Sequence, residues 1–347
     1  MKMNVLKQRM QTDMKPPKLS VIMPNYNHAK YIAEALEAVV TQSFEPFEVI
    51  VCDDGSTDNS VEIIQRFVDK YHFVRLIRNE TNLGANKTSN KLFTLISGDY
   101  VYGAAADDKV LPGFFEKSMN LLQKYPQAGL CSTLARLIDE NGNHKDVRLG
   151  ITLTINDSFI ESNRAKIALY KYGSWIGGGT TIFKRSALIE NGGFIEKLHS
   201  YSDSFIEQVI AVKYGVCFVP EALMCWRVLY DGYGMATRRN FDVRMETIKN
   251  VTDLMKGIFP AAYISKWRIN ELFSLKKDEL LSYRERDLSN IEKNDSGSLS
   301  KIIDKFRVNI VFVSLFLGIL TYFMLRYGRY FNIVTKIYYR YQKHKIV

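Results

Sequence analysis

The fold of this chain follows from residues 49–58, VIVCDDGSTD, in which a short apolar run ends in an acidic turn that contains a glycine. A second acidic pair, Asp107-Asp108, follows the predicted strand 100–104 in the same way. In an open α/β sheet, ligands bind beyond the carboxyl ends of the strands. Carboxylates gathered there repel one another, so they indicate a binding site rather than a contribution to stability. Hard divalent cations prefer oxygen ligands, so the pattern points to a metal that carries a phosphate group.

The segments around this stretch alternate between two kinds of secondary structure. Short apolar runs predict strands, and longer segments with apolar residues at helical spacing predict helices. The predicted strands are 19–23, 49–52, 74–78 and 100–104, and the predicted helices between them are 29–42, 60–71 and 86–97. Strands that alternate with helices of this length form βαβ units. We therefore expect an α/β fold with a mostly parallel central sheet.

The net charge of +10 belongs to the two ends of the chain. Residues 301–347 hold nine Lys or Arg against one acid, and residues 1–18 hold five against one, so the residues between are close to neutral. A nucleic-acid-binding domain usually carries a basic face, and this distribution argues against one. The four cysteines include no CxxC pair, which indicates reduced thiols in a core. The first 18 residues contain no apolar stretch, which argues against a secretory signal.

Further motifs lie in order along the chain. They are residues 20–27 (SVIMPNYN), 53–58 (DDGSTD), 82–84 (NLG), 98–101 (GDYV) leading to 106–108 (ADD), 192–194 (GGF), Asp203, and 220–223 (PEAL) before Trp226-Arg227. Together they resemble the family 2 glycosyltransferases. The resemblance implies a GT-A fold, which is a Rossmann-like nucleotide-diphospho-sugar transferase domain. It also implies transfer of a sugar from a nucleotide-activated donor with inversion at the anomeric carbon.

The resemblance and the composition set the expected domain boundaries. We expect a basic flexible leader, a GT-A domain with a nucleotide-binding half and an acceptor half, a helical extension with a linker, and a basic aromatic helical tail. These parts are residues 1–18, 19–240 (with halves 19–108 and 109–240), 241–300 and 301–347. The linker is predicted from residues 294–298, NDSGS.

Residues at the ends of the first two predicted strands are expected to bind the nucleotide. By the resemblance, Pro24 and Tyr26 form the floor and wall of the pocket, and an ordinary βα turn is the alternative. Asp54 can only accept hydrogen bonds when ionised, so it suits the N3–H donor of uracil or thymine. Asp53 would lie beside it. The alternative for this acidic turn is helix capping, for which Asp58 is the better candidate.

Further positions complete the expected nucleotide site. The resemblance places Asn82 and Gly84 against the nucleotide, together with Asp107. Arg227 is expected in a mobile loop that continues through residues 230–234, YDGYG. There the guanidinium of Arg227, or that of Arg238 or Arg239, would meet the diphosphate through charge-assisted hydrogen bonds. A plain surface loop is the alternative.

Asp107 and Asp108 match the acidic end of the metal motif in the family that the chain resembles, so a Mn²⁺ or Mg²⁺ cofactor is expected. A leaving diphosphate develops negative charge, and a bound cation stabilises it. This chain has Ala105 where the family usually has a further aspartate, which removes one contact to ribose or metal. The alternative is a pair of surface acids at the end of a strand.

Asp203 is the candidate general base. In an inverting displacement a carboxylate takes the proton from the acceptor hydroxyl as it attacks. Asp203 opens the predicted helix 203–214 and matches the position of the base in the family that the chain resembles. The alternative is a helix N-cap, a role for which Ser202 competes. The family often has two neighbouring acids here, whereas this chain has a single aspartate between Ser202 and Ser204.

An apolar run at 308–325 has basic residues on both flanks. A transmembrane span would place one of these flanks outside, against the positive-inside tendency. We therefore expect residues 301–347 to lie on an anionic membrane surface, which places the protein on the cytoplasmic face of the inner membrane. A single span and a core helix are the alternatives.

The expected reaction is transfer of a sugar from a UDP- or dTDP-sugar to an acceptor hydroxyl of a surface polysaccharide or a lipid-linked glycan. A sugar nucleotidyltransferase would carry a Gly-rich, Arg-containing loop after the first strand, whereas residues 24–28 are PNYNH. The other alternative is a catalytically inactive membrane-associated scaffold with a glycosyltransferase-like domain, which Ala105 leaves open. The oligomeric state does not follow from the sequence.

Overall fold

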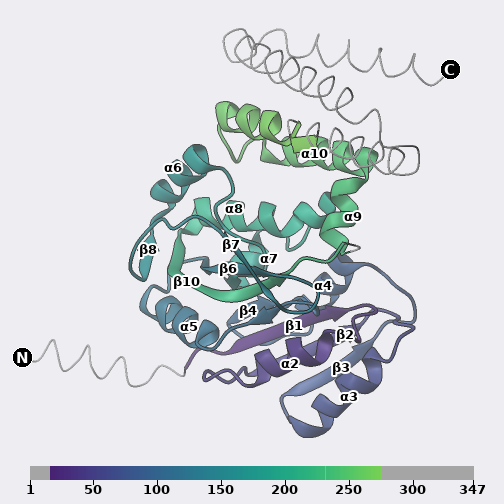
Figure 1. Cartoon of the computed structure of the whole chain (residues 1–347). Coiled ribbons are helices and arrows are strands. Elements are labelled where there is room, and N and C mark those ends of the chain that lie inside the picture. The colour runs from purple at the N-terminus through teal and green to yellow at the C-terminus, as the bar shows by residue number, and fades with distance from the viewer. Residues whose placement is uncertain (1–15, 231, 273, 276–347) are drawn as a thin grey trace, which may run out of the picture. The chain divides into compact units, whose positions relative to one another are not determined.

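The computed structural model describes residues 16–230, 232–272 and 274–275 (Figure 1). These residues belong to one unit that ends at Leu275. Most of the predicted leader, the predicted linker signal and the whole predicted tail at 301–347 lie outside the described residues. Within the described ranges, no helix is both long and apolar enough to cross a membrane.

The first half of the chain builds a parallel sheet in the order β3-β2-β1-β4 (Figure 1). The strands are β1 (Leu19–Asn25), β2 (Glu48–Asp53), β3 (Val74–Arg78) and β4 (Tyr100–Gly103), and the helices between them are α2 (Ile32–Val40), α3 (Ser60–Lys70) and α4 (Ala85–Phe93). Val49, Ile50 and Val51 of β2 are all fully buried. Strands that are covered on both faces have continuous apolar sequences. The parallel arrangement predicted for this half of the chain is confirmed.

The second half extends the same sheet in mixed directions, so the prediction of a mostly parallel sheet is wrong there. β9 (Thr181–Lys184) lies antiparallel between β4 and β6 (Leu130–Ile138), and β10 (Val216–Arg227) runs parallel to β6. β5 (Lys109–Val110), β7 (His144–Leu149) and β8 (Ser158–Ile160) pair antiparallel with β10, β6 and β10 respectively. Antiparallel neighbours need no crossover helix. The alternation of strands and helices that predicts parallel pairing therefore ends at β4.

Helices cover both faces of the sheet (Figure 1). Those of the second half are α5 (Phe114–Lys124), α6 (Ser162–Tyr172), α7 (Arg185–Glu190), a 3₁₀ turn η1 (Glu196–Tyr201), α8 (Ser202–Tyr214), α9 (Tyr233–Arg239), α10 (Phe241–Met255) and a helix at 261–272. Ile22 of β1 packs in one core cluster with Ile206 of α8, and Val21 packs in another with Leu36 of α2. Neighbouring strand residues point to opposite faces, so β1 joins the two cores.

β1 runs two residues further than predicted, through Pro24 to Asn25. Its pairing with β4 ends at Ile22–Gly103, whereas its pairing with β2 continues to Asn25–Asp53. Beyond Ile22 the strand therefore has a neighbour on one side only, and a proline is tolerated at such an edge. The break between β1 and β4 opens the carboxyl edge of the sheet where the acidic turns lie.

Candidate active site

Asp53 holds together the turn that follows β2. Its carboxylate is fully buried. Oδ1 accepts a hydrogen bond from Asn25 Nδ2 at 3.0 Å, and Oδ2 accepts one from the Ser56 N–H at 3.1 Å. Asn27 lies beside this turn with a φ of 55°, and its Oδ1 accepts from the Thr57 N–H at 2.8 Å. Both Asp53 oxygens are therefore used to fix the ends of β1 and β2 against one another.

Asp54, the residue predicted to recognise the base, is buried and points toward the loop before α4. Its Oδ1 accepts from Asn79 Nδ2 at 2.7 Å and from the Leu83 N–H at 2.9 Å. Its Oδ2 accepts from the Gly84 N–H at 2.9 Å, and Asn82 Oδ1 accepts from the same N–H at 2.8 Å. The structure thus brings three of the predicted residues together, because Asp54 contacts the turn that contains Asn82 and Gly84.

Pro24 and Tyr26, predicted as the floor and wall of the pocket, lie at the carboxyl end of β1 and just beyond it. Pro24 is partly buried, and Tyr26 is 41% exposed. An aromatic ring exposed in this way can stack on a base or a ribose. Asn25 between them has a buried Oδ1 without a hydrogen-bond partner in the described part of the chain. The exposed ring of Tyr26 therefore follows directly on a buried acceptor that has no partner among the described residues.

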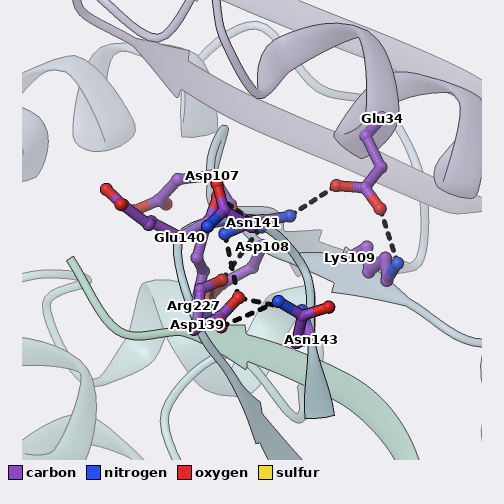
Figure 2. A network of polar contacts seen from close by, with 9 residues as sticks. All are labelled: Glu34, Asp107, Asp108, Lys109, Asp139, Glu140, Asn141, Asn143 and Arg227. Carbon is purple, nitrogen blue, oxygen red and sulfur yellow. Dashed lines mark hydrogen bonds and ion pairs between the residues drawn. The ribbon is translucent and has the colours of Figure 1, made fainter.

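Arg227 is the centre of a polar network at the end of β10 (Figure 2). Its backbone N–H donates to Asp108 Oδ1 at 2.7 Å, and its Nε donates to the Asp107 carbonyl at 2.8 Å. Its Nη1 donates to the carbonyls of Asp139 and Glu140, at 3.2 Å each. Through its backbone and its side chain, Arg227 thus connects the acidic pair to the turn between β6 and β7.

Glu34 of α2 completes this network (Figure 2). Its carboxylate accepts hydrogen bonds from Arg227 Nη2 and Lys109 Nζ. Burial acts to raise the pKa of Glu34, but the hydrogen bond and charge of Lys109, followed by the charge of Arg227, outweigh it and lower the pKa. The Arg227 guanidinium also lies 4.8 Å from the centre of the Tyr31 ring.

The prediction that Arg227 belongs to a mobile loop is wrong. Trp226 and Arg227 pair with Leu137 and Ile138 of β6, so β10 continues to this point. Arg227 is 3% exposed, and four of its five side-chain N–H groups donate within the chain. Buried guanidinium groups need such partners because an unpaired buried charge is costly. In this structure Arg227 holds the acidic pair in place.

Asp107 and Asp108 offer carboxylate oxygens that fit a hard cation. Among the described residues, none donates to the Asp107 carboxylate, and Asp108 Oδ2 lies 3.9 Å from the place where a Cβ would stand at Gly179. Burial, and then the charge of Asp107, raise the pKa of Asp108 well above its ordinary value. A cation would supply the missing positive charge. No group of three or more metal-ligating side chains occurs in the described ranges, so the other ligands would be water or phosphate oxygens.

A glycine turn separates the acidic pair from Asp203. A Cβ at Gly178 would lie 2.6 Å from Asp203 Oδ2, and one at Gly179 would lie 2.6 Å from Met224 Cε. The turn therefore lies directly against the Asp203 carboxylate on one side and near Asp108 on the other. Because glycine carries no side chain, the backbone of this turn can pack closely against the Asp203 carboxylate.

Asp203 lies in the first turn of α8, and no side chain caps this helix. Its Oδ1 accepts from the Ser204 N–H at 2.6 Å. Ser202, the competing cap, instead accepts a hydrogen bond at Oγ from the Ile195 N–H at 2.6 Å. Burial raises the pKa of Asp203 above its ordinary value, and backbone hydrogen bonds offset only part of this rise. The group is a stronger base than an ordinary aspartate.

Three residues of this site, Asn79, Glu34 and Glu207, were not predicted. Glu207 follows Asp203 by one helical turn, so helical spacing alone would have placed the two carboxyl groups on one face. Asn79 and Glu34 reach the site from β3 and α2, and no local pattern marks them. Their roles depend on which segments the fold brings together.

Comparison with known proteins identifies the family. A model described as glycosyl transferase family 2 matches residues 20–192, about half of the chain. YibD of Escherichia coli, described as an uncharacterized glycosyltransferase, is 39% identical over 104 residues. These residues are 30% of this chain, and the match spans only 30% of the length of YibD.

Two solved structures share the architecture. TarS of S. aureus in complex with UDP-GlcNAc superimposes with a TM-score of 0.58 at 20% identity, over 74% of this chain and 72% of that chain. The mannosyltransferase PcManGT of Pyrobaculum calidifontis, in complex with GDP-Man and Mn²⁺, gives a TM-score of 0.54 at 19% identity, over 89% and 88%. At such identities the likeness shows the fold alone. The fold is the predicted α/β GT-A type, although its sheet is mixed rather than mostly parallel. This fold and the match of the family model together show that the chain belongs to glycosyl transferase family 2.

Proposed function

We propose that this protein is a glycosyltransferase that moves a sugar from a nucleotide-diphosphate donor, a UDP- or dTDP-sugar, to an acceptor hydroxyl. The observation that carries the proposal is the placement of two acidic groups at the same glycine turn. Asp203 touches the turn at Gly178, and Asp108 lies near it at Gly179. The Asp203 carboxylate is then available to take a proton, and the Asp108 carboxylate lies beside the proposed position of the leaving diphosphate.

Asp203 is the proposed general base of an inverting displacement. The acceptor oxygen attacks the anomeric carbon, the bond to the diphosphate breaks, and the acceptor proton moves to Asp203 Oδ2. This oxygen faces the glycine turn, whereas Oδ1 is held by the Ser204 N–H. The raised pKa of Asp203 suits a group that must accept a proton near neutral pH.

Asp107 and Asp108 are proposed to hold a Mn²⁺ or Mg²⁺ ion with the donor. When bound, such a cation stabilises negative charge on the leaving diphosphate. Arg227 fixes both residues, through the carbonyl of Asp107 and the carboxylate of Asp108. The solved structure of PcManGT contains Mn²⁺ together with its donor, which supports the proposal by analogy.

The nucleotide is proposed to lie at the carboxyl ends of β1 and β2. Tyr26 supplies a ring for stacking, with Pro24 behind it. Asp54 Oδ2 accepts one N–H from the chain, which leaves a second acceptor position for the N3–H of uracil or thymine. Asp53 keeps this pocket in shape rather than reaching the ligand, because its side chain is fully buried and holds Asn25 and the Ser56 N–H.

The acceptor is proposed to be a surface polysaccharide or a lipid-linked glycan, reached from the cytoplasmic face of the inner membrane. The support is the sequence at 301–347, where basic and aromatic residues surround an apolar run. A basic segment of this kind is attracted to anionic lipids. The test is truncation after Gly297: the shortened protein should leave the membrane fraction, and retention there would contradict the attachment.

The activity is tested by hydrolysis of a panel of UDP-, dTDP- and GDP-sugars with Mn²⁺, with Mg²⁺ and with EDTA. Metal-dependent release of one nucleotide is expected from the wild type and should be lost in the double variant Asp107→Ala with Asp108→Ala. Transfer to an added acceptor should fall roughly 10²–10⁴-fold in Asp203→Asn. Asp69→Asn, an exposed aspartate on α3, is the control for a lost carboxylate.

Two results would contradict this proposal. If no nucleotide sugar is hydrolysed and none raises the melting temperature, the chain is an inactive scaffold with a transferase fold. If Asp203→Asn transfers sugar as fast as the control variant, another group is the base. The stereochemistry of the product, read by NMR of the anomeric proton, tests inversion separately.

A further inference from the structure

Glu207 is a buried carboxyl group that the proposed reaction does not use. It is 1% exposed. Its Oε1 accepts a hydrogen bond from the Thr181 hydroxyl at 2.7 Å, and its Oε2 has no hydrogen-bond partner in the described part of the chain. A neutral hydroxyl compensates poorly for burying a negative charge. The ionised form of Glu207 is therefore strongly disfavoured in this position.

The groups around Glu207 add no positive charge. Asp203 precedes it by one turn of α8, so both carboxyl groups lie on the same helix face. Tyr233 of α9 also faces this region, and burial together with the charge of Asp203 raises the pKa of its phenol. Burial, and then the charge of Asp203, raise the pKa of Glu207 well above its ordinary value, and only the Thr181 hydrogen bond opposes them. Two carboxyl groups thus share this face of α8, and no cation of the described residues affects the pKa of Glu207.

We propose that Glu207 is a positioning residue that keeps its proton at neutral pH, so that the negative charge of the pair stays on Asp203. The proposal rests on the proposed function, in which Asp203 is the base. Two carboxyl groups that share one site do not both ionise readily. Because Glu207 is the more deeply buried of the two, the proton stays there and Asp203 remains free to accept another.

The proton balance of the reaction is then simple. The O–H bond of the acceptor breaks and a new O–H bond forms on Asp203, while Glu207 keeps its own proton throughout. The proton on Glu207 also removes the negative charge that Oε2, a buried oxygen without a hydrogen-bond partner in the described part of the chain, would otherwise share. An ionised Glu207 would instead compete with Asp203 for the transferred proton.

Infrared spectroscopy of the full-length protein tests the protonation without any substrate. Any band from Asp108, whose pKa is also raised, is common to the wild type and Glu207→Gln and cancels in their difference spectrum. At pH 7 the wild type should also show the carbonyl stretch of a protonated carboxylic acid on Glu207, and this band should be absent in Glu207→Gln. The control Glu62→Gln, at an exposed position of α3, should keep it. If the wild type and Glu207→Gln have the same spectrum in this region, Glu207 is ionised and the proposal is wrong.

Kinetics with the nucleotide sugar that the donor panel identifies test the positioning role. Glutamine carries an acceptor and a donor as a protonated acid does, whereas leucine fills the volume with neither. Glu207→Leu should lower kcat by about tenfold or more without a matching change in the donor KM. Glu207→Gln should recover most of this loss. An acidic limb of the pH–rate profile should remain in Glu207→Gln, because Asp203 is the group that titrates.

The results separate this inference from the function on which it rests. If Glu207→Gln loses as much kcat as Glu207→Leu while both melt like the wild type, the charged form is needed and the proposal fails. If Glu207→Leu keeps the kcat of the wild type, Glu207 only fills space and the proposal also fails. If the wild type turns over none of the UDP-, dTDP- and GDP-sugars of the panel and none raises its melting temperature, the proposed function fails, and the infrared result alone decides the state of Glu207.

Discussion

Replacing Arg227 with methionine is expected to destabilise the fold by about 3–4 kcal/mol. The Arg227 side chain donates to the backbone carbonyls of Asp107, Asp139 and Glu140. Each of these hydrogen bonds contributes about 1 kcal/mol net, which makes about 3 kcal/mol for the three. The ion pair adds only about 0–1 kcal/mol, because the Glu34 side chain is 43% exposed. Methionine keeps most of the apolar stem, so the packing around it is retained.

Thermal unfolding of the full chain is the assay for this change. For a domain of this size, the expected loss of stability lowers the melting temperature by roughly 10 °C. Arg66→Met, an exposed arginine on α3, is the matched control and should change stability by less than about 0.5 kcal/mol. Nucleotide binding is titrated in parallel. If Arg227→Met melts within about 1 °C of the control while nucleotide binding weakens, Arg227 is a diphosphate ligand and the network reasoning is refuted.

Three further predictions concern the same site. Gly178→Ala should lower kcat because its Cβ would lie 2.6 Å from Asp203 Oδ2, whereas Gly177→Ala meets only atoms at 3.6 Å or more and should retain the wild-type kcat and melting temperature. Asp54→Asn should lower the free energy of unfolding in urea by about 2–3 kcal/mol. The reason is that an amide NH₂ group replaces one of the two oxygens that together accept from three internal donors. For Glu207, whose pKa is raised in the folded state, the wild type should lose stability relative to Glu207→Gln as pH rises above 4.5, by up to about 1.4 kcal/mol per pH unit. A wild type that gains stability over the variant across this range would contradict the raised pKa.

The parallel half of the sheet could be predicted because its elements are set by local pattern. β1, β2 and β4 contain apolar runs, and β1, β2 and β3 are each followed by a segment with helical spacing. Right-handed βαβ connections then leave few arrangements. β9 could not be placed in the same way, because its direction depends on the turn at 177–180, which leads it back between β4 and β6. A four-residue strand carries no mark of its direction.

The candidate site shows the same division. Asp107, Asp108 and Asp203 were predicted as site residues from motifs that carry reactive groups at the ends of predicted elements, and these roles stay predictions. Arg227 was placed in a loop because the glycines that follow it are typical of one, but β6 extends the pairing of β10 up to this residue. The sequence contains no sign of the acceptors that Arg227 finds on α2 and in the turn after β6.

Residue type and spacing were therefore sufficient for the βαβ half, the two acidic turns and the family, because these depend on interactions between residues close in the chain. Three features depend on contacts between segments that lie far apart in the chain, in one case 119 residues apart. They are the direction of β9, the burial of Arg227, and the placement of Asp108 and Asp203 at one glycine turn. The raised pKa of Glu207 belongs to the same group, since burial in the folded core is its largest cause. The free energy of a charge depends on everything that surrounds it, and only the folded chain provides those surroundings.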